Sequence, residues 1–226
     1  MPISRARKVE LVLSGLGRRY LGQDPLAGEG TALAKITAET EDPFQVLIGT
    51  ILSQRTRDEM TEIASRQLFA RYDTPQALAR ADVRDVQRRI KPVGFYRQKA
   101  RKLREVSRVL LDRHGGQVPA TYEELIELPQ VGPKTANCVL VYGYGLQALP
   151  IDTHCHRIPN RLGLIRTKTP EETEKALARI IPREYWVNVN EWFVRFGKEV
   201  CKPIGPRCGE CGFTSFCAYF RKRGKG

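Results

Sequence analysis

The feature that most constrains the fold of this chain is the spacing of its apolar residues, which is helical almost throughout. From Phe95 to His114 the apolar residues recur every three or four positions, as they do on one face of an α-helix. The segment that begins at Pro43 is apolar on all sides and therefore predicts a buried helix. We find neither the period-two alternation of a strand nor an Asn-Gly hairpin signal. The sequence predicts an all-α fold.

Capping residues mark where several of these helices begin. Thr121 with Glu124, and Thr169 with Glu172, have the spacing of a capping box, in which the two side chains satisfy backbone N–H groups of the first turn. These boxes predict one helix through Leu128 and another through Ile180. After Val200, Gly, Pro and Cys replace the helix formers, so we expect a loop-rich region there.

Basic residues outnumber acidic ones by a wide margin. The 226 residues include 38 Lys and Arg against 25 Asp and Glu, which gives a formal net charge of +13. Such an excess predicts a polyanionic partner, with nucleic acid first; solubility or adaptation to heat or salt is the alternative. Between Arg84 and Arg104 there are nine Lys or Arg and one acid, Asp85. This run forms either a solvated face or a phosphate contact.

The sequence carries no pattern that points to a membrane. No segment approaches the roughly 20 apolar residues that a spanning helix needs, and the first residues do not have the pattern of a signal peptide. We therefore expect a soluble protein of the cytoplasm, or of the nucleus if the source is eukaryotic. In such a compartment the six cysteines favour metal or cluster ligation over disulfides.

Four of the cysteines form a group near the C-terminus. They are separated by six, two and five residues: Cys201, Cys208, Cys211 and Cys217. Four thiolates so close together, with Gly and Pro between them, predict one tetrahedral thiolate site. Structural zinc sites usually pair shorter spacings, so this pattern favours a four-iron cluster but leaves zinc open. For Cys138 and Cys155 we expect packing in the core.

The segment LPQVGPKTAN, residues 128–137, places a glycine-containing turn directly before a predicted helix. Backbone N–H groups at a helix start form an anion site. With the preceding capped helix they predict a hairpin that holds a DNA phosphate at Val131 and Gly132; a plain loop is the alternative. Lys134 stands near the positive end of the second helix, a position that disfavours a protonated amine.

Asp152 lies eighteen residues after Lys134 and by itself predicts an N-cap for a helix through Leu162. Together, the hairpin, the lysine, the aspartate and the six-two-five cysteine spacing resemble the endonuclease III family of DNA glycosylases, within the helix–hairpin–helix superfamily. The resemblance extends from about Pro43 to Cys217.

The resemblance implies a base excision repair enzyme, a bifunctional DNA glycosylase and AP lyase that removes oxidised pyrimidines. By position, Lys134 matches the family's nucleophile, which forms a Schiff base with the sugar, and Asp152 matches its catalytic aspartate. The four grouped cysteines match the ligands of a [4Fe-4S] cluster, which decides against zinc. The implied partner is double-stranded DNA with damaged bases or abasic sites, and we expect a monomer.

The resemblance also implies the domain organisation. One helical lobe of six helices is expected over residues 36–146, including the hairpin. The other joins residues 1–35 to 147–226 and carries the cluster at 201–217, with the DNA cleft between the lobes. Lys202 and Arg207 lie on the loop between the first two cluster cysteines. They are either solvated loop charges or cations that the fixed loop presents to phosphates.

The chain departs from the family pattern at two places. Gln130 replaces the first glycine of the usual LPGVG hairpin. In the segment ILSQRTRD, residues 51–58, Arg55 stands where bacterial members place the glutamine that fills the gap left by the flipped base, and Gln54 precedes it. Either side chain is a candidate for that gap. The alternatives to the leading function are a glycosylase for thymine or uracil opposite guanine, and a DNA-binding module without catalysis.

Overall fold

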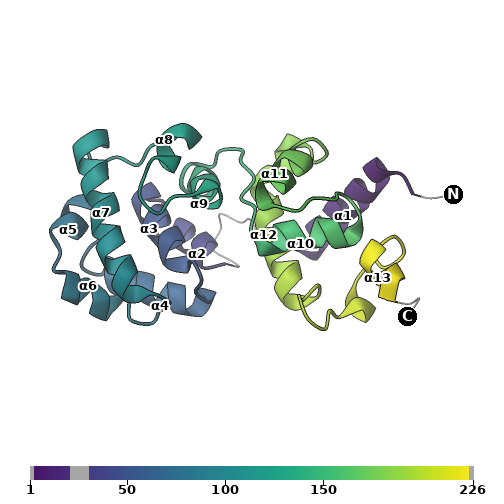
Figure 1. Cartoon of the computed structure of the whole chain (residues 1–226), viewed down its shortest axis with the longest axis horizontal. Coiled ribbons are helices and arrows are strands. Elements are labelled where there is room, and N and C mark those ends of the chain that lie inside the picture. The colour runs from purple at the N-terminus through teal and green to yellow at the C-terminus, as the bar shows by residue number, and fades with distance from the viewer. Residues whose placement is uncertain (1–2, 21–30, 224–226) are drawn as a thin grey trace. The chain divides into compact units, whose positions relative to one another are not determined.

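The computed structural model describes residues 3–20 and 31–223, and within these ranges every regular element is a helix (Figure 1). The all-α prediction is therefore confirmed. The chain divides into two compact units, one of Met1–Asp24 with Leu149–Gly226 and one of Pro25–Ala148. We call them the discontinuous unit and the contiguous unit. The expected lobe limits at residues 36 and 146 stay a prediction, and residues 21–30 lie outside the described ranges.

The contiguous unit is built around a buried helix. Its helices are α2 (Ala32–Thr40), α3 (Pro43–Ser53), α4 (Asp58–Phe69), α5 (Pro75–Arg80), α6 (Val83–Arg89), α7 (Tyr96–His114), α8 (Tyr122–Ile126) and α9 (Pro133–Cys138), and α9 continues as a π-helix over Val139–Gly143. Asp42 caps α3 by accepting a hydrogen bond from Phe44 N at 2.8 Å. The apolar residues of α3 from Val46 to Leu52 have no exposed surface, as the sequence predicts. Burial of each such side chain stabilises the fold by about 1.5–3 kcal/mol.

Helix ends follow the capping signals closely. Gly115 adopts φ 60°, and the N–H of Gly116 donates to Leu110 O at 2.8 Å, which closes α7 with a left-handed glycine cap. Thr121 caps α8 as predicted, but α8 ends at Ile126 rather than continuing to Leu128. One large apolar side chain of α4, Ile63, is 43% exposed.

The discontinuous unit has its own core. Its helices are α1 (Arg5–Arg19), α10 (Thr153–Leu162), α11 (Pro170–Ala178), α12 (Trp186–Glu199) and α13 (Ala218–Arg223), with 3-10 turns at Arg183–Tyr185 and Cys208–Glu210. Phe193 and Phe196 of α12 are fully buried, and Phe196 meets Phe213 edge-on with ring centroids 5.5 Å apart. Thr169 caps α11 as predicted, although the helix stops at Ala178, short of Ile180. In the described residues, no helix has both the length and the apolar character that crossing a bilayer requires.

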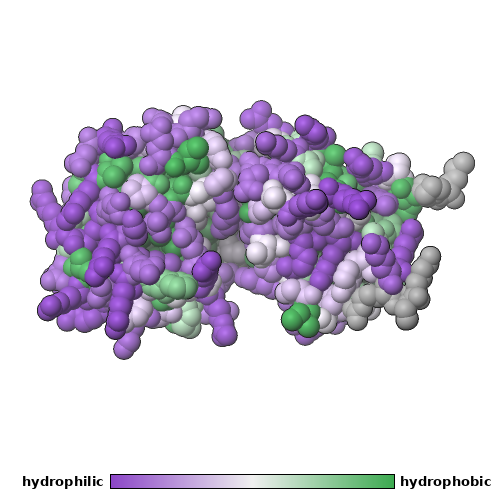
Figure 2. Space-filling view, in the orientation of Figure 1, coloured by the Kyte–Doolittle hydropathy of each residue, from purple (hydrophilic) through white to green (hydrophobic). Residues whose placement is uncertain are grey.

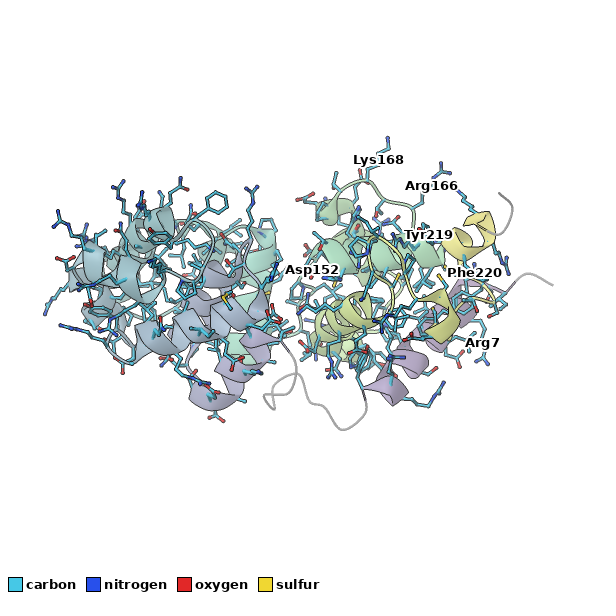
Figure 3. All side chains as sticks on the ribbon, turned by 90° about the horizontal axis from the view of Figure 1, so that it is seen from below. Arg7, Asp152, Arg166, Lys168, Tyr219 and Phe220 are labelled. Atoms are coloured by element: carbon cyan, nitrogen blue, oxygen red, sulfur yellow. The ribbon has the colours of Figure 1, made fainter. Side chains whose placement is uncertain are left out.

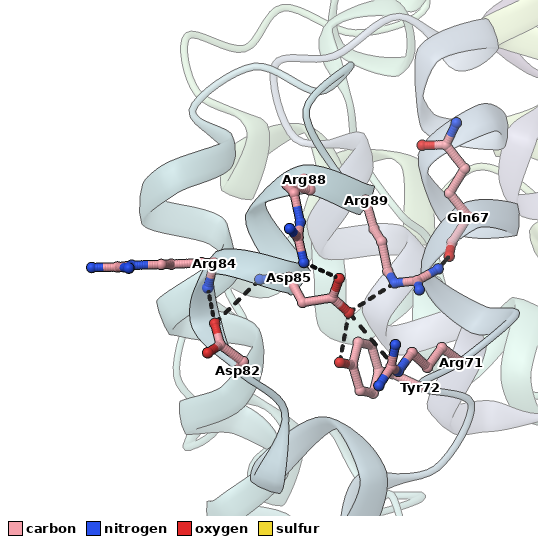
Figure 4. A network of polar contacts seen from close by, with 8 residues as sticks. All are labelled: Gln67, Arg71, Tyr72, Asp82, Arg84, Asp85, Arg88 and Arg89. Carbon is pink, nitrogen blue, oxygen red and sulfur yellow. Dashed lines mark hydrogen bonds and ion pairs between the residues drawn. The ribbon is translucent and has the colours of Figure 1, made fainter.

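The basic run from Arg84 to Arg104 is partly consumed by internal contacts. Its one acid, Asp85, accepts hydrogen bonds from the Tyr72 hydroxyl at 2.7 Å, Arg88 at 2.9 Å and Arg89 at 3.0 Å (Figure 4). These donors hold the pKa of the Asp85 carboxyl well below its usual range. Arg89 also donates to the Gln67 carbonyl at 3.0 Å, which ties α6 to α4. Two cations of the run therefore serve the fold.

Other cations of the run lie on the surface. The face shown in Figure 2 is predominantly hydrophilic, and its hydrophobic residues gather only in small groups. Arg97 and Arg101 of α7 are exposed. Such cations are available to an anionic partner, as the net charge of +13 predicts.

Candidate active site

Helices α8 and α9 form the predicted hairpin. Gly132 is the N-cap of α9, and its carbonyl accepts the first helical hydrogen bond from Ala136 N at 2.9 Å. Gly132 is exposed, and a Cβ built on it would meet nothing within 4 Å. Val131, by contrast, is 7% exposed. The hairpin therefore presents backbone at Gly132, while the Val131 side chain packs inward.

Gln130 gives the hairpin an unusual backbone. It adopts φ 66°, in the left-handed region that favours glycine and costs other residues about 1–2 kcal/mol. The Gln130 carbonyl accepts a hydrogen bond from Gln54 Nε2 at 3.0 Å, which helps to hold this conformation. A glycine at this position would adopt the same left-handed backbone without the strain that a side chain causes.

Lys134 is the second residue of α9 and is half-buried. Proline at the first position of α9 starts the helix without loss of a hydrogen bond. The next residue, Thr135, accepts from Gln54 Nε2 at 3.3 Å. The helix changes from α to π at Val139, an irregularity that is frequent at functional sites. Lys134 is therefore carried on a helix start that is bonded to the α3–α4 turn.

Asp152 caps α10, as the sequence predicts (Figure 3). Its Oδ1 accepts hydrogen bonds from the backbone N–H groups of His154 and Cys155, each at 2.8 Å. Both bonds go to the same oxygen, so one carboxylate oxygen orients the side chain. This geometry fixes Asp152 at the start of the helix without using Oδ2 for the cap.

The histidines beside Asp152 do not converge on one ion. His154 Nδ1 lies 3.0 Å from Arg157 Nη2, while His156 Nδ1 lies 2.6 Å from Thr173 Oγ1 on α11. Cys155 between them is fully buried, and burial raises the pKa of its thiol. Cys138 is likewise fully buried. The prediction that these two cysteines pack in the core is confirmed.

The four grouped cysteines line one cavity of the discontinuous unit. The cavity is walled by apolar side chains, among them Phe196 of α12, Val200 directly after that helix, and Phe220 of α13. All four cysteines are free thiols. Burial, and to a smaller extent the three neighbouring thiols, raise the pKa of Cys211. In residues 3–20 and 31–223, no three His, Cys, Asp or Glu side chains are drawn together as ligands of a single ion.

Two arginines of α10 hold the loop that follows Cys201. Arg157 donates to the Cys201 carbonyl at 2.9 Å. Arg161 donates to the carbonyls of Lys202 and Pro203, both at 2.7 Å, and its guanidinium lies 4.2 Å from the ring centroid of Tyr219. The loop from Cys201 to Cys208 is thus bonded along its backbone to a helix.

The two cations predicted on this loop differ in environment. Lys202 is half-buried, whereas Arg207 is exposed. The Nη1 atom of Arg207 lies 3.8 Å from Oε2 of Glu210. The Arg207 N–H donates to Val200 O at 2.9 Å, which fixes the loop's end. Between them, Ile204 is 91% exposed.

The turn between α3 and α4 separates Gln54 from Arg55. Gln54 points its amide to the hairpin, through the bonds to Gln130 and Thr135. Arg55 is exposed, adopts φ 53°, and places its guanidinium 5.7 Å from the Phe95 ring centroid. Of the two candidates for the gap in the duplex, Gln54 is bonded within the protein and Arg55 is exposed.

Sequence reasoning missed two residues beside this turn. Phe95 is 56% exposed and adopts φ 58°. A Cβ on Gly94 would lie 2.9 Å from Arg55 O, so only glycine fits there. The signal available in the sequence was an aromatic residue interrupting a basic run directly after glycine, a combination suited to nucleic-acid binding.

A comparison with known families identifies the class of protein. The model of the HhH-GPD superfamily base excision DNA repair proteins matches residues 48–183. The chain belongs to this superfamily. Within it, the chain is similar to Endonuclease III of Thermotoga maritima, at 54% identity over 185 residues, 82% of this chain and 87% of that protein. It is 36% identical to Endonuclease III of Bacillus subtilis over 81% of this chain and 84% of that protein.

Solved structures agree with the sequence comparison. A trapped Endonuclease III–DNA covalent intermediate superposes with a TM-score of 0.84 at 30% identity, covering 98% of this chain and 99% of that one. The chain is a bifunctional DNA glycosylase and AP lyase of base excision repair. The alternative of a DNA-binding module without catalysis is thereby set aside.

Proposed function

We propose that the enzyme removes oxidised pyrimidines from double-stranded DNA, with Lys134 as its nucleophile and Asp152 as its catalytic carboxylate. The observation that carries the proposal is the position of Lys134 at the start of α9, two residues after the exposed backbone of Gly132. A phosphate held at Gly132 keeps the strand beside the amine. We further infer that it acts as a monomer in the compartment that holds the cell's DNA.

The chemistry proceeds through a covalent intermediate. The damaged nucleotide is flipped out of the duplex, since its C1′ is unreachable within the stack. The uncharged Lys134 amine bonds to C1′ while the C1′–base bond breaks, and the base leaves with a proton. The sugar ring then opens to a Schiff base. Loss of a C2′ proton expels the 3′ phosphate, and water finally hydrolyses the imine and returns the lysine.

Asp152 supplies the negative charge that this sequence needs. Positive charge develops on the sugar as the base departs, and the lysine must lose a proton before it attacks. A carboxylate held by the N–H groups of His154 and Cys155 is suited to either task, by charge stabilisation or by proton transfer. The cap orients this carboxylate before the substrate arrives, which lowers the cost of reorganisation.

We assign the gap in the duplex to Arg55 rather than to Gln54. The Gln54 amide is already bonded to Gln130 and Thr135, and inserting it would break both bonds. Arg55 is exposed beside Phe95, and an exposed ring offers a stacking surface for a base. A guanidinium in the gap has donors that match the acceptors of guanine.

This assignment predicts the preference for the opposite base. We expect the wild type to cleave lesions opposite guanine faster than opposite adenine. Arg55→Gln should shift that ratio toward adenine by about tenfold, because a carboxamide matches adenine and each good pair contributes about 1–3 kcal/mol. Single-turnover rates on thymine glycol, dihydrouracil, uracil and thymine, each opposite both purines, measure the shift. An unchanged ratio would contradict the Arg55 assignment, and activity confined to uracil and thymine opposite guanine would contradict oxidised pyrimidines.

We also propose that the four grouped cysteines hold a [4Fe-4S] cluster. They are free, share one cavity with apolar walls, and supply the four thiolates that such a cluster takes. The four cysteines would hold the cluster and thereby cross-link the loop that carries Lys202 and Arg207. Base excision transfers no net electrons, so the reaction itself would not need the cluster as an electron carrier.

Metal analysis tests the cluster directly. Protein purified without oxygen should be brown and contain iron and acid-labile sulfide in equal amounts, about four of each per chain. Cys208→Ser should lower both contents and destabilise the discontinuous unit, whereas Cys138→Ser, in the contiguous unit, should leave the iron content unchanged. Stoichiometric zinc in a colourless protein would overturn the assignment.

A further inference from the structure

A lysine is buried against the turn that carries Arg55. Lys99, on α7, is 6% exposed, which is unusual for a lysine. Its Nζ donates to the carbonyls of Leu52 at 2.7 Å and Gln54 at 2.6 Å, and to Thr56 Oγ1 at 3.1 Å. An ammonium has three donors, and these three bonds use all of them. Every acceptor is a neutral oxygen of one five-residue turn.

The bonds lie where α3 needs them. The last carbonyls of a helix have no intrahelical partner, and the partial negative charge of that end attracts a cation. Helix α3 ends at Ser53, so the carbonyls of Leu52 and Gln54 belong to this end. Burial lowers the pKa of Lys99 to about 8, which leaves the group protonated at pH 7. Lys99 therefore caps α3 from a neighbouring helix.

The same turn is joined to the segment before α7. Thr56 Oγ1 accepts from Gly94 N at 3.2 Å and lies 3.3 Å from Gln54 O, to which it donates. The closeness of Gly94 to Arg55 O adds a packing contact. The left-handed backbone of Arg55 costs energy, and such a conformation persists only where its surroundings enforce it. Lys99 and Thr56 provide that enforcement on both sides of Arg55.

We propose that Lys99 is a positioning residue, which holds the turn from Leu52 to Thr56 in the conformation that presents Arg55 to the gap in the duplex. The proposal rests on the assignment of Arg55 under the proposed function. This role can be distinguished from a purely structural one. Loss of a positioning Lys99 should affect only the steps that need a filled gap, whereas loss of a lysine that only stabilises the fold should affect all steps alike.

The test variant is Lys99→Met, which keeps an unbranched side chain of similar length and removes all three donors. At pH 7 we expect its single-turnover rate on a duplex lesion to fall about tenfold, as is typical when a supporting contact is removed and a functional group shifts by a fraction of an ångström. Lyase cleavage of an abasic site in single-stranded DNA, where there is no gap to fill, should stay within about twofold of wild type. Lys35→Met is the matched control, since Lys35 bonds Glu62 at 2.8 Å within the same unit, away from this turn.

A double-mutant cycle identifies the route of the effect. In an Arg55→Ala background, Lys99→Met should cause no further loss on the duplex, because residues that act through one another are not additive. Equal losses on both substrates, or losses that add in the double mutant, would overturn the proposal. If Arg55→Ala alone leaves the duplex rate unchanged, the assignment of Arg55 fails, and this result is separate from the outcome for Lys99.

A second variant guards against poor folding of Lys99→Met. Thr56→Val has nearly the same shape and removes one acceptor of Lys99 together with the link to Gly94. It should reproduce a smaller loss, about threefold, that is again confined to the duplex substrate. Thermal unfolding of each variant shows whether the fold is retained. A Thr56→Val enzyme whose rate on the duplex is unchanged, or whose rates on both substrates fall equally, would count against the proposal.

Discussion

Lys134→Gln is expected to eliminate the covalent protein–DNA adduct that borohydride traps during turnover. The amine is the only group in the proposed sequence that forms a bond to C1′, so its removal should lower lyase activity by about a thousandfold or more. Glutamine keeps a similar length and helix propensity, so α9 should form as before. Denaturing electrophoresis of reduced reaction mixtures measures the adduct.

The control for this variant is Lys168→Gln. Lys168 is exposed on the loop between α10 and α11 and, like Arg166, extends away from the body of its unit (Figure 3). The Lys168→Gln enzyme should form the borohydride-trapped adduct to the same extent as the wild type. Binding of Lys134→Gln to DNA with a reduced abasic site should also be retained. If Lys134→Gln still traps the adduct in full, another amine is the nucleophile and the proposed mechanism is wrong.

Asp152→Asn should lower the rate of base removal by about a hundredfold or more, because an amide has no negative charge to offer the sugar or the lysine. Its effect on the fold should be small, since asparagine caps helices about as well as aspartate and its carbonyl can accept from His154 and Cys155. Asp152→Ala removes both charge and cap, and should cost about 1 kcal/mol of stability in addition.

The pair of variants separates the two roles of one residue. Single-turnover kinetics on a duplex lesion reports the charge, and urea unfolding reports the cap. We expect equal rates in the two variants but lower stability for Asp152→Ala alone. A fully active Asp152→Asn enzyme would show that the carboxylate only caps the helix. An N-cap is also the role that the sequence position of Asp152 predicts when it is considered by itself.

Local signals in the sequence predicted much of the fold because they act over a few residues. The uniformly apolar segment after Pro43 became the buried helix α3, and Thr121, Asp152 and Thr169 cap the helices they were expected to cap. Helix limits were less accurate at Ile126 and Ala178, where short helices end without a strong stop signal. The positive φ of Gln130 was beyond prediction from this chain's local sequence, because glutamine does not favour that conformation.

The sequence alone determined the kind of protein: helical spacing, the hairpin, Lys134 with Asp152, and the cysteine spacing are patterns that survive without coordinates. Tertiary structure decided how the α3–α4 turn is used. In the folded chain the Gln54 amide is bonded to the hairpin and Arg55 is exposed. Lys99, one cation of the basic run, is buried and donates hydrogen bonds to three oxygens of the turn. The physical reason is distance along the chain: these bonds join residues 43 to 81 positions apart, and no local preference encodes which partners a folded chain brings together.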